Sequence, residues 1–162
     1  AAVRLANDVL PLTQSDQLQL IIAGTAPTAK VKQLASDRVE VTGWIPDMRW
    51  AYQQADLFVA PLRIGTGQQN KILEALAFGI PCITTSHVMS GFLSEQGKKT
   101  PLPPLVLADS PEETARAIDD LLNNEARRAE LSLSSRSWIE QHASWGFHSL
   151  KLVDSFVHSS KL

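Results

Sequence analysis

Residues 57–84 read LFVAPLRIGTGQQNKILEALAFGIPCIT, and this stretch carries the strongest fold signal in the chain. It opens with the apolar run 57–61, whose unbroken character is typical of a strand buried on both faces of a sheet. A loop containing Gly65 and Gly67 follows, and the apolar residues after it recur at helical spacing. The stretch closes with a second apolar run, 80–84, so it predicts a strand–loop–helix–strand unit of a parallel sheet.

The rest of the chain repeats this alternation of short apolar runs and helical segments. One segment, 111–123, opens with a helix start signal, because Ser110 is a candidate N-cap, Pro111 stands first and Glu113 could complete a capping box. Only helical signals follow, the last of them an amphipathic stripe over 147–157. We therefore predict an α/β fold with a Rossmann-like parallel sheet, helices on both faces and C-terminal helices. The predicted strands are 18–23, 39–45, 57–61, 80–84 and 105–108.

The chain begins inside a helix, because apolar residues recur at helical spacing over 3–12 and no strand signal precedes them. In the doubly wound strand order 3-2-1-4-5-6, the first strand lies in the middle of the sheet. We therefore expect a single domain that lacks its first strand, and we expect the chain to be a piece of a longer protein. Strands 18–23 and 57–61 would then lose the neighbour between them. We expect them to close up on each other, to accept a strand from another chain, or to leave backbone groups unpaired and the domain destabilised.

Composition narrows the classes of function. The 162 residues suit one globular domain, and the 44% hydrophobic content excludes disordered and fibrous classes. The net charge of −2 argues against a nucleic acid or an anionic membrane held by bulk charge. The single cysteine, Cys82, excludes a disulfide framework and a cysteine-built zinc site, and no Asp-x-Asp motif occurs, so we expect neither a metal nor a cofactor. No apolar run reaches the ~20 residues of a membrane span and no signal-peptide pattern opens the chain, which predicts a cytoplasmic protein.

The loop and helix at the centre of the chain form the candidate site. Ligands of open α/β sheets bind beyond the carboxyl ends of the strands, which is where loop 65–68 lies, and a helix N-terminus after it attracts phosphate. Lys71 could bind a phosphate as a point charge, and Glu74 on the same polar face could accept hydrogen bonds from a pair of ribose hydroxyls. Phosphate and ribose together indicate a nucleotide. On spacing alone, however, the glycines also fit a simple turn, and Lys71 and Glu74 also fit a solvated i, i+3 ion pair.

Residues 70–82, NKILEALAFGIPC, resemble the nucleotide-sugar signature of group 1 (family 4) glycosyltransferases, which have the GT-B fold. Cys82 stands where that family usually has valine. Further segments are similar to the family's other motifs in the same order, so the likeness covers most of the chain. These segments are 18–24, 41–47, 55–61 and 143–145.

The resemblance implies that residues 1–162 are the C-terminal, donor-binding domain of such an enzyme, with the N-terminal acceptor domain absent from this chain. It implies that Glu74 binds the donor ribose, that the backbone of Trp44 and Ile45 frames the base, and that Gly24 lines the crevice at the switch point of the sheet. Residues 65–68 would lie against the sugar and diphosphate. The full set of implied donor-binding residues is Gly24, Trp44, Ile45, Gly65, Thr66, Gly67, Gln68, Lys71 and Glu74.

The implied reaction moves a sugar from a nucleotide-diphosphate sugar to a saccharide, a lipid-linked saccharide or another acceptor, with retention at the anomeric carbon. The catalytic groups stay unassigned, and this chain alone would be inactive. Polysaccharide biosynthesis is a common setting for the family; the full protein could touch a membrane peripherally or form oligomers, and no nucleic-acid partner is expected.

Two departures from the family pattern affect the site. Many members carry an acidic residue eight positions before the conserved glutamate, and here that position is Thr66. The family's basic Arg and Lys pair after the first strand has no counterpart, which leaves Lys71 and the helix N-terminus for the phosphates.

Several alternatives stay open on sequence alone. They include a GT-B-like sugar-nucleotide epimerase, a phosphorylase, for which nothing singles out a pyridoxal-binding lysine, and a non-catalytic α/β interaction domain. For single residues, Trp44 fits core packing as well as base contact, and His87 fits either a loop position or substrate contact.

Overall fold

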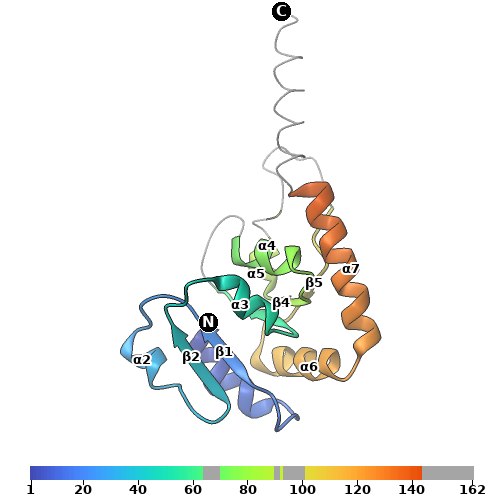
Figure 1. Ribbon diagram of the computed structural model, residues 1–162. Helices are drawn as coiled ribbons and strands as arrows, with labels where there is room; N and C mark the ends of the chain where they lie inside the picture. Colours follow the sequence, from blue (N-terminus) through green and yellow to red (C-terminus); the bar gives the residue numbers. More distant parts are fainter. Residues whose placement is uncertain (64–69, 90–91, 93–100, 144–162) are drawn as a thin grey trace, which may run out of the picture.

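The computed structural model describes residues 1–63, 70–89, 92 and 101–143, and these form an α/β fold with parallel sheets (Figure 1). The described part contains two sheets, one with the order β1-β2 and one with the order β3-β4-β5. All ladders in both sheets are parallel, so the predicted fold class is confirmed. The strands are β1 (Leu20–Ala23), β2 (Val39–Gly43), β3 (Phe58–Ala60), β4 (Cys82–Thr84) and β5 (Leu105–Leu107).

Helices alternate with these strands, as the sequence predicts. The first three helical elements follow one another without a break and are called the N-terminal helical segment here; they comprise α1 (Ala2–Arg4), the π-helix η1 (Leu5–Val9) and the 3-10 helix η2 (Leu10–Leu12). The remaining helices are α2 (Ala29–Lys32), α3 (Met48–Gln53), α4 (Asn70–Ala77), α5 (Ser86–Met89), α6 (Pro111–Leu122) and α7 (Glu125–His142). The predicted capping box of α6 is present, with Ser110 accepting from the Glu113 amide. The helix expected over 147–157 lies outside the described residues. In the part of the chain that the structure describes, no helix combines the length and apolar character needed to cross a membrane.

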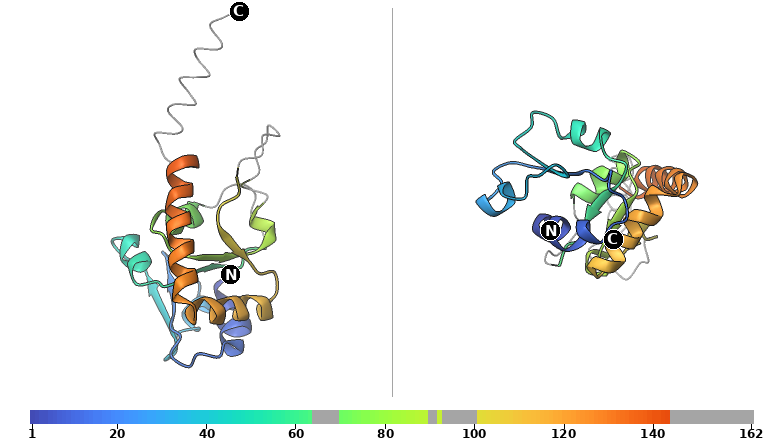
Figure 2. Two further views of the ribbon diagram at one scale, coloured as in Figure 1. Left: turned by 90° about the vertical axis from the view of Figure 1, so that its right-hand side faces the viewer. Right: turned by 90° about the horizontal axis from the view of Figure 1, so that it is seen from below.

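The core has two halves, one on each face of the three-stranded sheet. Successive residues of a strand point to opposite faces, and β4 therefore sends Cys82 into one cluster and Ile83 into the other. The Cys82 cluster contains α4 and Trp138 from α7. The Ile83 cluster contains the N-terminal helical segment and α6, which lie beside each other in Figure 2. All three residues of β4 are buried, because this strand is paired on both sides and covered on both faces.

The two sheets are not joined to each other in the described part of the chain. Residues 1–17 contain helices and no strand, as expected, and no ladder connects β1 with β3. The Leu20 amide of β1 donates to the Arg38 carbonyl, on the side of β1 that faces β2. Because successive amides of a strand point to opposite edges, the Ile21 amide points to the edge away from β2. Strand β1 is only half-buried along its length, although its apolar run is also unbroken. In β3, Phe58 and Val59 are half-buried and Ala60 is buried, so the expectation of a strand buried on both faces is met only at its end. Of the three outcomes expected for these strands, closing up on each other is not observed.

The end of α4 is set by Gly79, whose φ of 73° lies in the left-handed region. Its amide donates to the Leu76 carbonyl at 2.9 Å and the Ile80 amide donates to the Ala75 carbonyl at 3.0 Å, which is the Schellman pattern of helix termination. A Cβ at position 79 would meet the Arg136 guanidinium and lie 2.7 Å from Ser132 Oγ on α7. The turn therefore favours glycine, and any larger residue at position 79 would also force the side chains of Arg136 and Ser132 to shift.

We expect Gly79→Ala to lower the free energy of unfolding by about 2–3 kcal/mol, because it adds a clash with α7 to the strain of a left-handed alanine. Gly43→Ala is the matched control, since Gly43 also has a positive φ of 67° but a Cβ there meets nothing within 4 Å. The control should cost only about 1 kcal/mol. Urea denaturation of both variants measures the difference. Equal losses in the free energy of unfolding would show that the side chains of α7 move aside without a penalty.

Cys82 is a buried core residue, as expected for a side chain that replaces valine. Burial raises the pKa of its thiol to about 12, so almost no thiolate exists at neutral pH in the folded chain. We expect a thiol reagent such as Ellman's reagent to label Cys82 only through unfolding, at a rate that rises steeply with urea. The fully denatured chain is the positive control, and fast stoichiometric labelling of the native chain at pH 7 would contradict this prediction.

Candidate functional site

The loops after β1 and β2 meet at the carboxyl ends of these strands. The Gly24 amide donates to the Gly43 carbonyl at 3.3 Å, which holds the two chain segments together as they leave the sheet. A Cβ at either glycine would meet no atom within 4 Å, so both positions border open space. Gly24 therefore lies at the carboxyl end of β1 with open space beside it.

The turn after β2 presents its aromatic residue to solvent. Trp44 is 69% exposed, so the alternative in which it packs in the core is wrong. Ile45 beside it is half-buried.

Helix α3 starts directly after this turn. Asp47 is its N-cap and accepts a hydrogen bond from the Arg49 amide at 2.9 Å, while the Arg49 guanidinium forms a salt bridge with the same carboxylate at 2.7 Å. These hydrogen bonds from Arg49 lower the pKa of Asp47. The Asp47 cap therefore fixes the first turn of α3, and Tyr52 lies near the other end of this helix, where it contacts α4.

Helix α4 shows the two faces that its sequence predicts. Its apolar face is buried in the core, through Ile72, Ala75 and Leu76. Lys71 and Glu74 are both exposed on the polar face. Among the described residues they form no salt bridge with each other, so the reading of the pair as an ion pair is not what the structure shows.

Glu74 has a different partner, which sequence reasoning missed. The Tyr52 hydroxyl donates to Glu74 Oε2 at 2.8 Å and lies 3.4 Å from the Lys71 carbonyl oxygen. The contact joins α3 to α4 across 22 positions of sequence, so helical spacing could not have revealed it. It brings the turn after β2 and the polar face of α4 into one site. The predicted residues Gly65, Thr66, Gly67 and Gln68 lie outside the described residues.

A second polar cluster occupies the carboxyl ends of β4 and β5. Asp109, just after β5, accepts hydrogen bonds from the Ser86 amide at 2.8 Å and the Ser86 hydroxyl at 2.7 Å. Its carbonyl accepts from the Arg4 guanidinium at 2.9 Å, which ties the N-terminal helical segment to the same edge. Arg4 and Arg63 line an open cavity of about 540 Å³ there, between this segment and the end of β3. No local pattern in the sequence brings these residues together, because their proximity is purely tertiary.

The Asp109 cluster makes stability depend on pH. The hydrogen bonds from Ser86 lower the pKa of Asp109 below its ordinary value, so the ionised form stabilises the fold. This contribution is complete above the pKa of the unfolded chain, about 4, and disappears as the pH falls through the lower folded value. We expect Asp109→Asn to lower the free energy of unfolding at pH 7 and to flatten its decline between pH 4 and pH 2. Ser86→Ala should show a smaller effect of the same sign, whereas an unchanged slope in both variants would contradict the assignment.

Comparison with known proteins identifies the family of the chain. The chain matches the family model for glycosyl transferases group 1 over residues 1–124. A comparison with curated protein sequences finds no match. The family match runs from the N-terminal helical segment through α6, and it includes the turn after β2 and the polar face of α4. Because it covers well over half of the chain, the chain belongs to the group 1 glycosyltransferases.

Proposed function

We propose that this chain is the donor-binding, C-terminal domain of a glycosyltransferase that uses a nucleotide-diphosphate sugar. The observation that carries this proposal is that the exposed carboxylate of Glu74 is held by a buried tyrosine of α3, the helix that begins just after the turn of Trp44 and Ile45. The family match covers both elements, and a group 1 glycosyltransferase domain implies a nucleotide-sugar donor. Glu74 would bind the ribose of that donor.

Each part of the site has a distinct task in this proposal. The carboxylate of Glu74 accepts hydrogen bonds from two ribose hydroxyls, which are among the stronger neutral-to-charged hydrogen bonds available. The backbone at Trp44 and Ile45 frames the base, and Gly24 leaves space for the nucleotide at the mouth of the sheet. Lys71 supplies positive charge for the diphosphate, and residues 65–68 lie against the sugar and the diphosphate.

In the proposed reaction, stabilising the negative charge that develops on the leaving diphosphate is the main electrostatic contribution to catalysis. Breaking the bond between sugar and nucleotide places negative charge on the leaving diphosphate, and fixed positive groups stabilise that charge in the transition state. The proposed reaction retains the configuration at the anomeric carbon and passes the sugar to a saccharide, lipid-linked saccharide or other acceptor. Acceptor binding and the remaining catalytic groups belong in this proposal to an N-terminal domain of the same enzyme, so the 162-residue chain alone binds donor without turning it over.

The test is nucleotide binding by Glu74→Gln. We expect the chain to bind UDP or GDP in a titration followed by calorimetry and by backbone amide NMR, with the largest shifts over residues 65–74. The substitution removes the charge from two hydrogen bonds and should weaken binding at least tenfold, since each charged bond contributes about 1.5–3 kcal/mol. Glu130→Gln is the matched control, because it neutralises an exposed carboxylate on α7 away from the site.

The same titration separates the alternatives. A non-catalytic interaction domain predicts no saturable nucleotide binding and no effect of position 74. A sugar-nucleotide epimerase predicts binding but, in the two-domain enzyme, inversion within the sugar nucleotide without transfer to an acceptor. Loss of binding in Glu130→Gln equal to that in Glu74→Gln would overturn the site assignment.

A further inference from the structure

Tyr52 is a buried tyrosine whose one polar atom is directed at the proposed ribose carboxylate. The residue is 7% exposed, and its hydroxyl donates to Glu74 Oε2 at 2.8 Å. Glu74 itself is exposed, so the buried phenol of Tyr52 holds a carboxylate that faces solvent. In the described part of the chain, no hydrogen bond is made to the other oxygen, Glu74 Oε1, which stays available to a ligand.

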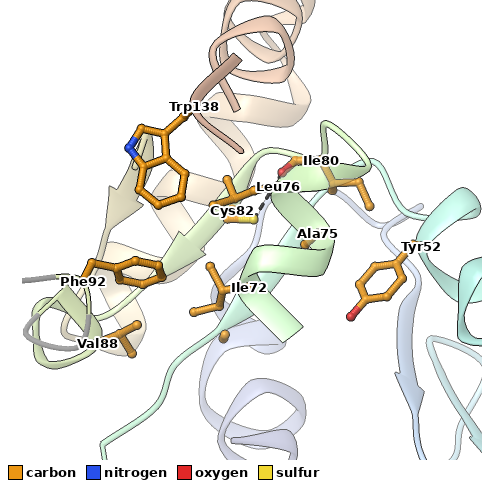
Figure 3. Close-up of a cluster of buried hydrophobic side chains, with 10 residues drawn as sticks. Tyr52, Ile72, Ala75, Leu76, Ile80, Cys82, Val88, Phe92 and Trp138 are labelled. Carbon is orange, nitrogen blue, oxygen red and sulfur yellow. Dashed lines mark hydrogen bonds between the residues drawn. The ribbon is translucent and has the colours of Figure 1, made fainter. Parts of the chain in front are cut away.

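The phenol ring is held in place by its aromatic neighbours. It stacks on Phe78 with ring centroids 5.2 Å apart and 19° between the planes, and it lies tilted against Phe58 at 6.0 Å. Figure 3 shows Tyr52 on the side of α4 opposite to Trp138 and Phe92, with the helix between them. The hydroxyl therefore cannot follow Glu74 if the carboxylate rotates away, and the carboxylate has one preferred position.

The phenol is also suited to remain a donor. Burial, followed by the hydrogen bond to Glu74, raises the pKa of Tyr52 well above its ordinary value. The hydroxyl thus keeps its proton at neutral pH and can donate it to the carboxylate.

Tyr52 also connects the two halves of the site. It lies in α3, the helix that starts at the Asp47 cap directly after the Trp44–Ile45 turn. A single short helix thus runs from the segment proposed to frame the base to the carboxylate proposed to bind the ribose. Base and ribose are adjacent parts of one nucleoside, so their protein partners must keep a set separation.

We infer that Tyr52 is a positioning residue for the nucleoside of the sugar donor, which fixes Glu74 so that its carboxylate meets the ribose hydroxyls without reorganisation. This inference rests on the proposed function of Glu74. Preorganisation of this kind improves affinity by removing the cost of ordering a flexible side chain on binding. The effect is specific to ligands that carry the hydroxyls.

Tyr52→Phe tests the inference, because phenylalanine keeps the stacking on Phe78 and removes only the hydroxyl. The probes are UDP or GDP, whichever the chain binds more tightly, and the 2′,3′-dideoxy form of the same nucleotide. We expect Tyr52→Phe to weaken binding of the ribonucleotide five- to twentyfold and to leave binding of the dideoxy form within twofold of the parent chain. A double-mutant cycle with Glu74→Ala should be strongly non-additive, since alanine removes the group that Tyr52 positions.

Thr114→Val is the matched control for the loss of a buried hydroxyl. Thr114 is buried in α6, and its hydroxyl donates to the Ser110 carbonyl at 2.8 Å. This variant should lower stability to a similar degree and leave the affinity for both nucleotides unchanged, which separates positioning from general destabilisation.

Two results would overturn the inference while the proposed function stands. One is parent-like ribonucleotide affinity in Tyr52→Phe when Glu74→Gln has lost binding, and the other is an equal loss for the ribose and dideoxy forms. Failure of the parent chain to bind either UDP or GDP would instead overturn the proposed function of Glu74, and the inference with it.

Discussion

The structure depends on β4 being buried on every side. This strand pairs with β3 on one edge and with β5 on the other, and its alternate side chains enter the two halves of the core. A parallel strand needs cover on both faces, because its neighbours reach it only through crossover helices that pack there. Helix α4 supplies that cover on the Cys82 face, and α6 with the N-terminal helical segment supplies it on the Ile83 face. The helices are thereby fixed relative to the carboxyl ends of the strands, where the candidate site lies.

The position of Glu74 follows from that constraint. Ile72 and Leu76 must face the core, so residue 74 on the same helix must face outward. Gly79 ends the helix one turn later and returns the chain to β4, which fixes the length of α4 between the loop and the sheet. Tyr52 then reaches the carboxylate from another element. A functional carboxylate is thus exposed by the packing of its own helix and oriented by a neighbour.

The structure also explains why β1 and β2 behave differently from the other strands. They form a sheet of their own, and the edge of β1 away from β2 has no ladder in the described part of the chain. The half-buried state of β1 is the direct consequence, because a strand paired on one side leaves its flank accessible. The contact between Tyr52 and Glu74 consequently has added importance, since it links the segment after β2 to the helix that follows β3.

The amino-acid sequence by itself determined the element types and the faces of the helices. Alternation of apolar runs with helical spacing predicted a parallel α/β fold, Ser110 and Glu113 predicted a capping box that is present, and spacing alone separated the buried from the exposed side of α4. These are local properties, because periodicity and capping depend on residues within one or two turns of each other.

Only the tertiary structure decided which distant residues meet. The hydrogen bonds from Tyr52 to Glu74 and from Arg4 to Asp109 join segments that are far apart in sequence. Trp44 is exposed because no neighbouring element covers it. No local pattern encodes such contacts, since a side chain acquires a distant partner only when the packing of whole elements places the two together.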